Sequence, residues 1–241
     1  MAKKNSPEIL YQSEHILAIN KKAGVLSIPD RFDKSKENLV DLLRPEFPGL
    51  LPVHRLDKET SGVLLFALNP ESHKYLSHAF EKGKVEKFYL AIVEGNPVTD
   101  SGHIRASIGV DKAHLGKMKI DGKGKLSHTS WEMIERFRGF SLLKVQIHTG
   151  RTHQIRVHML YIGHPLAVDS LYGKRESISI ADIKPHAKVN PNDAQPGVLI
   201  QRCSLHAEQL SFTDPGGKTI TLQAPLPKDM NALLNQLRKA K

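Results

Sequence analysis

Short apolar runs alternate with polar breaks near the start of the chain. The runs at 8–12 (EILYQ), 15–20 (HILAIN) and 24–29 (GVLSIP) are separated by turn residues, which predicts three strands joined by tight turns. Residues 61–68 form an unbroken apolar segment, which is typical of a strand buried on both faces. Asn69-Pro70-Glu71 then supplies an N-cap, a proline at the first helical position and an early acidic residue, so we expect a helix ending near Gly83.

The rest of the chain predicts more strands than helices. The expected strands lie at 87–93, at 130–137 and 140–148 around an Arg-Gly turn, and at 205–212 and 219–222. The expected helices lie at 153–162 and at 229–239, and the proline-rich stretch 173–198 predicts a long surface excursion. We therefore expect an α+β fold: one domain over residues 8–241 with a mixed, mainly antiparallel sheet and flanking helices, after a short basic tail at 1–7.

Composition narrows the class of protein and of partner. The 241 residues carry 35 Lys and Arg against 25 Asp and Glu, a formal net charge of +10, which favours an anionic partner such as nucleic acid or a membrane surface. A single cysteine, Cys203, excludes a disulfide scaffold and a cysteine-rich zinc module. The chain has neither an apolar signal segment nor an apolar run long enough to span a bilayer, so we expect a cytoplasmic protein without a membrane anchor.

Common cofactor and metal signatures are missing from the sequence. It contains no G-x-x-x-x-G-K-[ST], G-x-G-x-x-G, H-E-x-x-H or C-x-x-C motif. His148, His153 and His158 lie five residues apart, which does not place a pair on one helix face as a zinc helix requires. We therefore expect no cofactor and no metal.

Two polar clusters remain as candidates for chemistry. In the first, PVHRLDKETSGVLLFA at 52–67, Asp57 lies between cations just ahead of the most apolar strand, where an ionised carboxylate can act as nucleophile or base. The alternative is a solvated turn with local ion pairs.

The second cluster is HTGRTHQIRVH at 148–158. Its Arg151 and Arg156 are suited to pair with carboxylate or phosphate, and Gly150 allows a close backbone approach. The alternative is a solvated helix start. No rule of sequence shows that the two clusters meet.

These clusters resemble two motifs of the RluA-type pseudouridine synthase family. Residues 54–62 read HRLDKETSG against H-R-L-D-x-x-T-S-G, and 150–156 read GRTHQIR. The segments KFYLAIVEG at 87–95 and NKKAGVLSIP at 20–29 are similar to two further family motifs, and the resemblance extends over about residues 8 to 237. Lys22 stands where proline is usual in the family. Val168 stands where glycine is usual, and this second departure puts a local turn conformation in question. We expect no separate S4-type RNA-binding domain, because the matching strands begin by Glu8.

The resemblance implies the pseudouridine synthase fold with a central RNA-binding cleft, and isomerisation of uridine to pseudouridine in RNA without a cofactor. It implies that Asp57 acts on the sugar, either by attacking C1′ or by removing the C2′ proton. Arg151 would pair with Asp57, Tyr89 would stack on the uracil and serve in proton transfer from C5, and Ile155 would pack on the other side of the base.

Several further residues are expected to hold the substrate. By motif, Arg55 would fill the space left by an extruded nucleotide or hold the backbone, while His54 would chiefly fix the loop. Five lysines in the glycine-rich stretch 111–125, among them Lys117 and Lys119, suggest a basic loop that closes on phosphates, with a solvated hairpin tip as the alternative.

The expected partner is a stem-loop of tRNA or rRNA, and the expected oligomeric state is a monomer. Two other functions stay open at this point. One is a non-catalytic RNA-binding protein of the same fold, which would have no need of Asp57; the other is a metal-independent ribonuclease, which would cleave the strand rather than isomerise a base.

Overall fold

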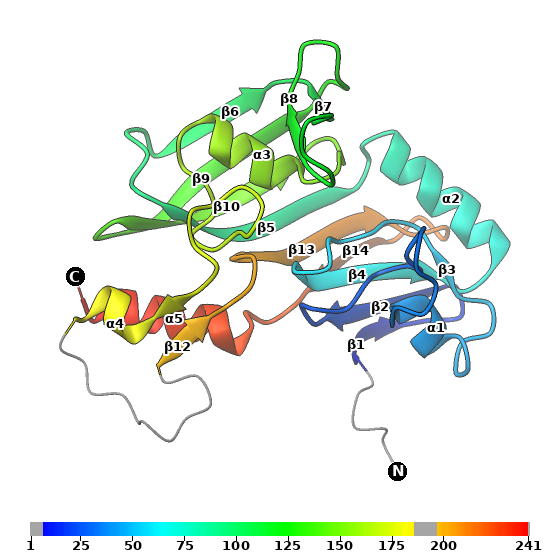
Figure 1. The fold of residues 1–241 in the computed structure, drawn as a ribbon. Coiled ribbons are helices and arrows are strands. Elements are labelled where there is room, and N and C mark those ends of the chain that lie inside the picture. The colour runs from blue at the N-terminus through cyan, green and yellow to red at the C-terminus, as the bar shows by residue number, and fades with distance from the viewer. Residues whose placement is uncertain (1–6, 186–196, 241) are drawn as a thin grey trace. The chain divides into compact units, whose positions relative to one another are not determined.

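The computed structural model describes residues 7–185 and 197–240. They divide into two compact units, which can be followed in Figure 1. Unit 1 comprises Met1–Phe88 and Ala207–Pro225, and unit 2 comprises Tyr89–His206 and Leu226–Lys241. Of the expected basic tail at 1–7, residues 1–6 lie outside the described residues. The extent of the expected domain, 8–241, stays a prediction.

Unit 1 is built on a sheet with the strand order β1-β2-β4-β13-β14, and β3 pairs with β4. The strands are β1 (Glu8–Gln12), β2 (Ile16–Lys21), β3 (Leu51–Pro52), β4 (Ser61–Ala67), β13 (Leu205–Thr213, whose first two residues belong to unit 2) and β14 (Thr219–Gln223). All seven residues of β4 are buried, which confirms the prediction of a strand covered on both faces. A glycine is required within it, because a Cβ on Gly62 would clash with the Ala207 carbonyl oxygen.

Two helices complete unit 1. Helix α2 (Pro70–Glu81) follows β4 as predicted: the Asn69 side chain accepts a hydrogen bond from the Ser72 amide, and Pro70 occupies the first turn. Its Leu76 and Ala79 pack into the core that the sheet forms. The short helix α1 (Leu39–Leu43), capped by Asn38, was not predicted.

The strand predicted at 24–29 is wrong. In this segment only Leu26 forms a β-bridge, with Asn38. Gly24 adopts a φ of +89°, which favours glycine and breaks an extended strand. The Gly24 amide and the Ser27 hydroxyl bond instead to the loop that carries Asp57. The apolar pattern of the segment therefore reflects burial beneath that loop rather than membership of the sheet.

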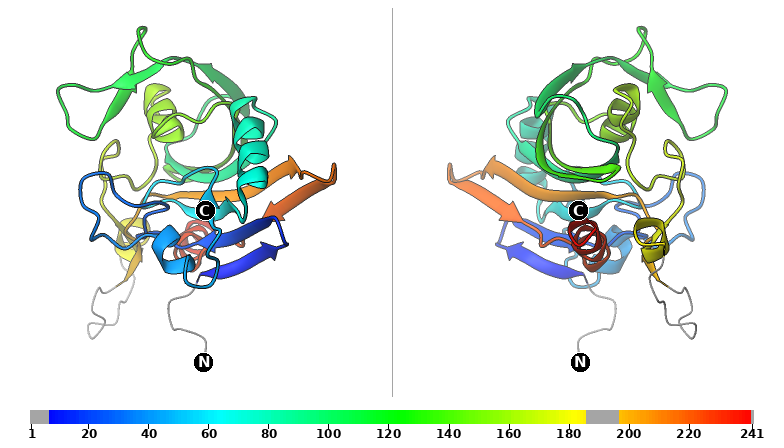
Figure 2. Two further views of the ribbon diagram at one scale, coloured as in Figure 1. Left: turned by 90° about the vertical axis from the view of Figure 1, so that its right-hand side faces the viewer. Right: turned by 90° about the vertical axis from the view of Figure 1, so that its left-hand side faces the viewer.

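Unit 2 is built on a sheet with the order β5-β10-β9-β6, which curls around helix α3 (Figure 2). The elements are β5 (Glu86–Glu94, whose first three residues belong to unit 1), β6 (Ser101–Arg105), β9 (His128–Phe137), β10 (Phe140–Ile147) and α3 (Gln154–Tyr161). The predicted hairpin at 130–148 is confirmed, and Gly139 provides its turn at φ +78°. The predicted terminal helix is α5 (Lys228–Arg238), whose leucines pack with β5 and β10 residues in one core.

The remaining elements of unit 2 are short. Strands β7 (Ile108–Val110) and β8 (Met118–Ile120) form a separate hairpin that carries the basic segment. The excursion predicted at 173–198 is in part structured, as β11 (Ile178–Ser179), α4 (Ile180–Ile183) and β12 (Val198–Ile200); its residues 186–196 lie outside the described ones. Ile178 and Ile200 are buried against α5, so a non-local contact orders a segment that lacks periodicity of its own.

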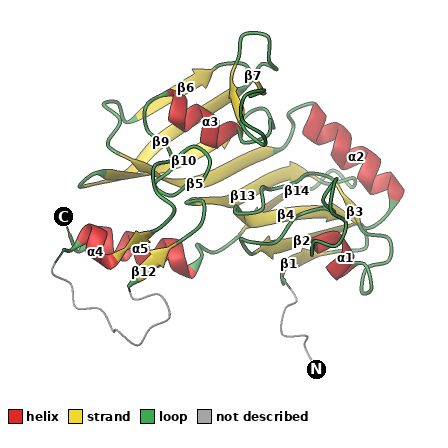
Figure 3. Cartoon of the chain, in the orientation of Figure 1, coloured by secondary structure: helices red, strands yellow, loops and turns green. Residues whose placement is uncertain are grey.

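Strands outnumber helices, as Figure 3 shows, and every strand pair whose register is resolved is antiparallel. The predicted α+β class with a mainly antiparallel sheet is confirmed. Within the described part of the chain, no helix is long and apolar enough to cross a membrane.

Candidate active site

Asp57 lies in the irregular loop between β3 and β4. The Thr60 amide donates to the Asp57 carbonyl oxygen at 3.0 Å, which closes a turn around the aspartate. Leu56 and Thr60 on either side are buried, while Asp57 is half-buried and Arg55 is exposed. The loop is thus anchored by its apolar and hydroxyl residues and presents its charged side chains.

A buried lysine holds this loop through hydrogen bonds to backbone carbonyl oxygens. Lys21, the last residue of β2, is 0% exposed, and its Nζ donates to the carbonyl oxygens of Lys58 at 2.9 Å, Thr60 at 2.8 Å and Lys22 at 3.0 Å. An ammonium group offers three donors, and hydrogen bonds from a charged donor are stronger than neutral ones. Lys21 therefore fixes the backbone on the C-terminal side of Asp57.

The residues that follow β2 add two further contacts, one on each side of Asp57. The buried Ser27 hydroxyl donates to the Leu56 carbonyl oxygen at 2.9 Å and accepts from the Leu56 amide at 3.1 Å. The Gly24 amide donates to the Lys58 carbonyl oxygen at 2.9 Å. Backbone groups of this irregular loop that are not paired in the sheet are satisfied in this way.

His54 is a structural member of the loop. Its Nε2 accepts a hydrogen bond from the Leu65 amide at 3.0 Å, and its ring stacks on Phe80 with 4.7 Å between centroids. Burial, with the nearby charge of Lys87, lowers the pKa of His54 from 6.5 to about 3. The imidazole is therefore neutral at physiological pH and joins the loop to β4 and α2.

In unit 2, the turn before α3 positions Arg151. Gln154, which is 3% exposed, accepts hydrogen bonds at its Oε1 from the Thr149 hydroxyl (2.8 Å) and the Arg151 amide (3.0 Å). Its Nε2 donates to the His128 carbonyl oxygen and the Thr129 hydroxyl. One amide side chain thus ties the turn to β9 and leaves Arg151 exposed at the start of the helix.

Arg156 proves to be a structural residue of α3. It forms a two-pronged ion pair with the buried Asp169, with both nitrogen–oxygen distances at 2.7 Å, and its guanidinium lies 5.0 Å from the Tyr172 ring centroid. Of the two partners expected for Arg156, carboxylate or phosphate, the structure shows a carboxylate. Val168 beside this pair is buried, and His153 is the single non-glycine residue with a positive φ in the described part of the chain, so Val168 fits without left-handed backbone.

The other expected site residues have distinct settings. Tyr89 on β5 is 8% exposed and Ile155 on α3 is 4% exposed, so both side chains are buried. Lys119 lies on β8, 4.0 Å from the Asp111 carboxylate, and Lys117 immediately precedes that strand. In the basic segment 111–125, Lys112 and Lys117 therefore lie on the turn between β7 and β8, Lys119 lies on β8, and Lys123 and Lys125 follow that strand.

The structure brings the expected residues together in groups rather than in one site. His54, Arg55 and Asp57 share one loop of unit 1, whereas Arg151 and Ile155 share one turn of unit 2. Asp57 belongs to unit 1 and Arg151 to unit 2, and their meeting stays a prediction. In the described part of the chain no cluster of three His, Cys, Asp or Glu residues is arranged to hold a metal ion.

Sequence reasoning missed three residues that organise these groups: Lys21, Ser27 and Gln154. A signal for the first was present, because a lysine at the end of an otherwise apolar strand needs a partner when it is buried. Ser27 and Gln154 had no such signal, because a neutral polar residue in a polar segment is not unusual.

Comparison with known proteins shows which family this chain is similar to. A family model described as RNA pseudouridylate synthase matches residues 15–161. The chain is 36% identical over 237 residues to Ribosomal large subunit pseudouridine synthase D of Nitrosomonas europaea, covering 96% of this chain and 65% of that protein, which is just under two thirds of its length. It is 34% identical over 221 residues to Dual-specificity RNA pseudouridine synthase RluA of Salmonella typhi, covering 90% of this chain and 92% of that one.

A solved structure shares the fold. Human RNA Pseudouridylate Synthase Domain Containing 4 superposes with a TM-score of 0.75 at 23% sequence identity, covering 96% of this chain and 93% of that chain.

Proposed function

Because this chain belongs to the RNA pseudouridylate synthase family, we propose that it isomerises uridine to pseudouridine in a structured RNA through Asp57. The observation that carries the proposal is the rigid loop around Asp57, which Lys21, Ser27 and His54 hold by hydrogen bonds. A carboxylate held in one geometry on a fixed loop is preorganised for chemistry on a bound nucleotide.

The reaction rearranges bonds within one nucleotide. The N1–C1′ glycosidic bond breaks, the uracil turns, and C5 bonds to C1′; C5 then loses its proton and N1 gains one. Atoms and electrons balance without an oxidant or reductant. In this proposal Asp57 acts on the sugar, either as a nucleophile at C1′ or as a base that removes the C2′ proton.

The roles proposed for unit 2 follow the family motifs. Arg151 pairs with Asp57 and keeps it ionised once the base excludes water. Tyr89 stacks on the uracil and takes part in the transfer of the C5 proton, and Ile155 packs against the other side of the base. The hydrogen bonds of Gln154 to the turn before α3 support the placement of Arg151, because they fix its backbone.

The target nucleotide must leave its helix or loop stack to reach Asp57, which costs a few kcal/mol. We assign Arg55 to the space that the base vacates or to the adjoining backbone, since it is exposed beside Asp57. Lys117 and Lys119 contact phosphates. Among the residues that we assigned to substrate binding, His54 serves by fixing the loop, in keeping with its bonded and neutral ring.

The finer identity of the substrate is part of the proposal. We expect a stem-loop of tRNA or large-subunit rRNA, in which the target base is already partly unstacked. The relatives carry names that refer to the ribosomal large subunit in one case and to dual specificity for RNA in another. A cytoplasmic monomer is the form in which we expect the chain to act.

One assay tests the function directly. The protein is incubated with tRNA and rRNA transcripts, and pseudouridine is mapped by carbodiimide treatment and primer extension. We expect new stops at one or a few uridines with wild-type protein and none with Asp57→Asn, while Asp57→Asn still binds RNA. A matched control is Asp100→Asn, which changes an exposed aspartate paired with Arg136 in unit 2 and should leave activity intact.

Three results would contradict the proposal. Bound RNA without new pseudouridine in any substrate would indicate a non-catalytic binding protein. Shortened RNA would indicate a ribonuclease, because isomerisation leaves the chain length unchanged. Appreciable turnover by Asp57→Asn would remove Asp57 from its role.

A further inference from the structure

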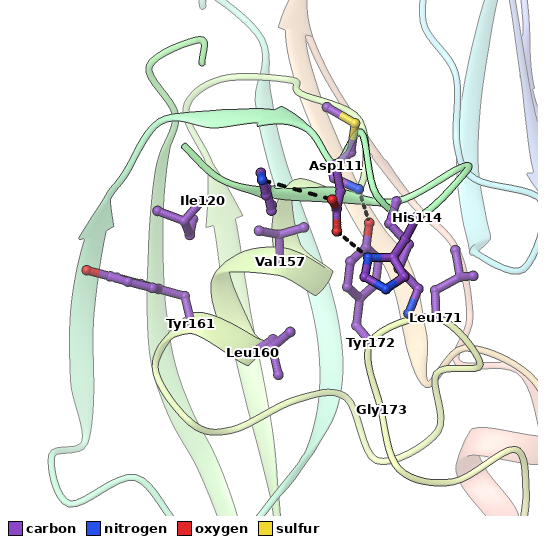
Figure 4. A pocket seen from close by; sticks show the side chains of 12 residues that line it. Asp111, His114, Ile120, Val157, Leu160, Tyr161, Leu171, Tyr172 and Gly173 are labelled. Carbon is purple, nitrogen blue, oxygen red and sulfur yellow. Dashed lines mark hydrogen bonds and ion pairs between the residues drawn. The ribbon is translucent and has the colours of Figure 1, made fainter. Parts of the chain in front are cut away.

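Unit 2 holds a pocket that belongs to neither group of expected catalytic residues. It measures about 540 Å³ and lies between hairpin β7–β8 and helix α3 (Figure 4). That volume falls in the range of about 300–1,000 Å³ that small-molecule sites occupy. The residues that line it do not include Asp57, Tyr89 or Arg151.

The pocket has an apolar wall that stays open to solvent. Ile120, Val157, Leu160 and Tyr161 line one side of it, and Leu160 and Tyr161 come from the end of α3 (Figure 4). The Tyr161 side chain is 60% exposed and Leu160 is 44% exposed. Single exposed apolar residues are common, but adjacent ones at the mouth of a pocket indicate a binding surface.

The rim of the pocket on the hairpin side is basic. Lys117 and Lys119 line it together with His114, and the segment 111–125 carries five lysines against two aspartates. Asp111 is the acidic member of the lining; it is hydrogen-bonded to His114 Nδ1 at 2.8 Å and lies 4.0 Å from Lys119 Nζ. The local charge therefore favours an anionic ligand.

The pocket is also fixed in shape. The Tyr172 hydroxyl accepts a hydrogen bond from the Met118 amide of β8 at 2.7 Å and lies 2.8 Å from His153 Nδ1 at the start of α3. The backbone of Tyr172 is held in turn, because its amide donates to the buried Asp169 carboxylate. This hydroxyl therefore ties the hairpin to the helix and keeps the two walls of the pocket together.

We propose that this pocket binds an unpaired nucleotide of the RNA, other than the uridine that reacts. Its base stacks on the exposed ring of Tyr161 and packs against Leu160 and Ile120, and its phosphate contacts Lys117 and Lys119. An aromatic face beside lysines is the combination that single-stranded nucleic acid requires, because every base has a π-face and every linkage a negative charge. The inference rests on the proposed function for the identity of the RNA.

The stacking part is tested with fluorescein-labelled octauridylate as the probe and fluorescence anisotropy as the readout. Tyr161→Ala should raise the dissociation constant about 5- to 100-fold. Tyr161→Trp should bind as tightly as wild type, while Tyr161→Leu, which is apolar without an aromatic face, should behave like the alanine variant. Tyr75→Ala is the matched control, since Tyr75 is a 40% exposed tyrosine on α2 of unit 1.

The phosphate part is tested by the salt dependence of the same binding. Lys117→Gln should reduce the slope of log K against log salt by about 0.7, which corresponds to one phosphate contact on a single strand. Tyr161→Ala should weaken binding and leave that slope unchanged. An unchanged slope for Lys117→Gln would remove Lys117 from the site.

The outcomes separate this inference from the proposed function. If wild-type protein forms pseudouridine and Tyr161→Ala binds octauridylate as tightly as wild type, the pocket is not an RNA site and the function stands. If wild-type protein forms no pseudouridine but octauridylate binding depends on Tyr161, the function is wrong and the pocket remains an RNA site. If the pocket instead holds a second copy of this chain, Tyr161→Ala will alter sedimentation without RNA and leave octauridylate affinity unchanged, which also overturns the proposal.

Discussion

The ion pair of Arg156 with Asp169 should be the most sensitive point for the stability of unit 2. Both side chains are buried, at 7% and 0% exposed, and two hydrogen bonds of 2.7 Å join them. Asp169 also accepts from the amides of Leu171 and Tyr172. Asp169→Asn keeps the shape but leaves the Arg156 charge buried without its partner, which typically costs about 3–5 kcal/mol.

The assay is urea unfolding followed by the fluorescence of Trp131, the single tryptophan, which is buried on β9 and reports on unit 2. If the free energy of unfolding falls by about 2 kcal/mol per molar urea, the expected loss of stability lowers the urea concentration at the unfolding midpoint by about 1.5–2.5 M. Arg238→Gln is the matched control, because the side chains of its ion pair with Glu135 are 45% and 21% exposed, and a pair that is accessible to solvent should contribute no more than about 1 kcal/mol.

The dependence on pH gives a second readout of the same pair. Burial alone would raise the pKa of Asp169, but the hydrogen bonds and charge of Arg156 and the two backbone amides lower it below the ordinary value of 3.8. The pair therefore contributes stability that is present above the unfolded pKa and is lost as pH falls through the folded one. In the Asp169→Asn variant, the free energy of unfolding should therefore depend less on pH in the acid range.

A double variant tests the attribution. Replacing both partners, as Arg156→Met with Asp169→Leu, should recover part of the loss, because no charge is left buried without its partner. A loss of less than about 1 kcal/mol for Asp169→Asn, equal to that of the Arg238 control, would refute the reasoning and show that Arg156 is solvated once it is released.

Three further predictions concern unit 1. Gly62→Ala should destabilise unit 1 by more than about 1–3 kcal/mol, which is the cost of backbone strain alone, because the new Cβ would also meet the Ala207 carbonyl oxygen. Gly139→Ala is the control, since a Cβ there meets open space; in urea unfolding it should show only the cost of backbone strain. Because the pKa of His54 in the folded protein is about 3, the free energy of unfolding should fall by up to about 5 kcal/mol as pH drops from 6.5 towards 3. If the same pH dependence persists in a His54→Leu variant, it does not arise from His54. Lys21→Met should lower kcat at least about tenfold with little change in RNA affinity, since three carbonyl oxygens lose their donor; an equal rise in the dissociation constant would show a binding role instead.

Local pattern was sufficient for most of the fold. The unbroken apolar run at 61–68 predicted the buried strand β4, and Asn69-Pro70 predicted the start of α2, because capping and periodicity act within a few residues. The same pattern misled at 24–29, where the apolar residues are buried against a loop and not in a sheet. Burial alone does not distinguish those two settings.

The sequence by itself determined the class of the fold, the family and the position of Asp57, because motif spacing and hydrophobic periodicity are written along the chain. Only the tertiary structure decided what holds that aspartate and what Arg156 does. Lys21 and Lys58 lie far apart in sequence, as do Met118 and Tyr172, and a hydrogen bond between such residues exists only once the backbone has brought donor and acceptor within reach. The pocket beneath hairpin β7–β8 has the same origin, since its walls come from three segments that no local pattern joins.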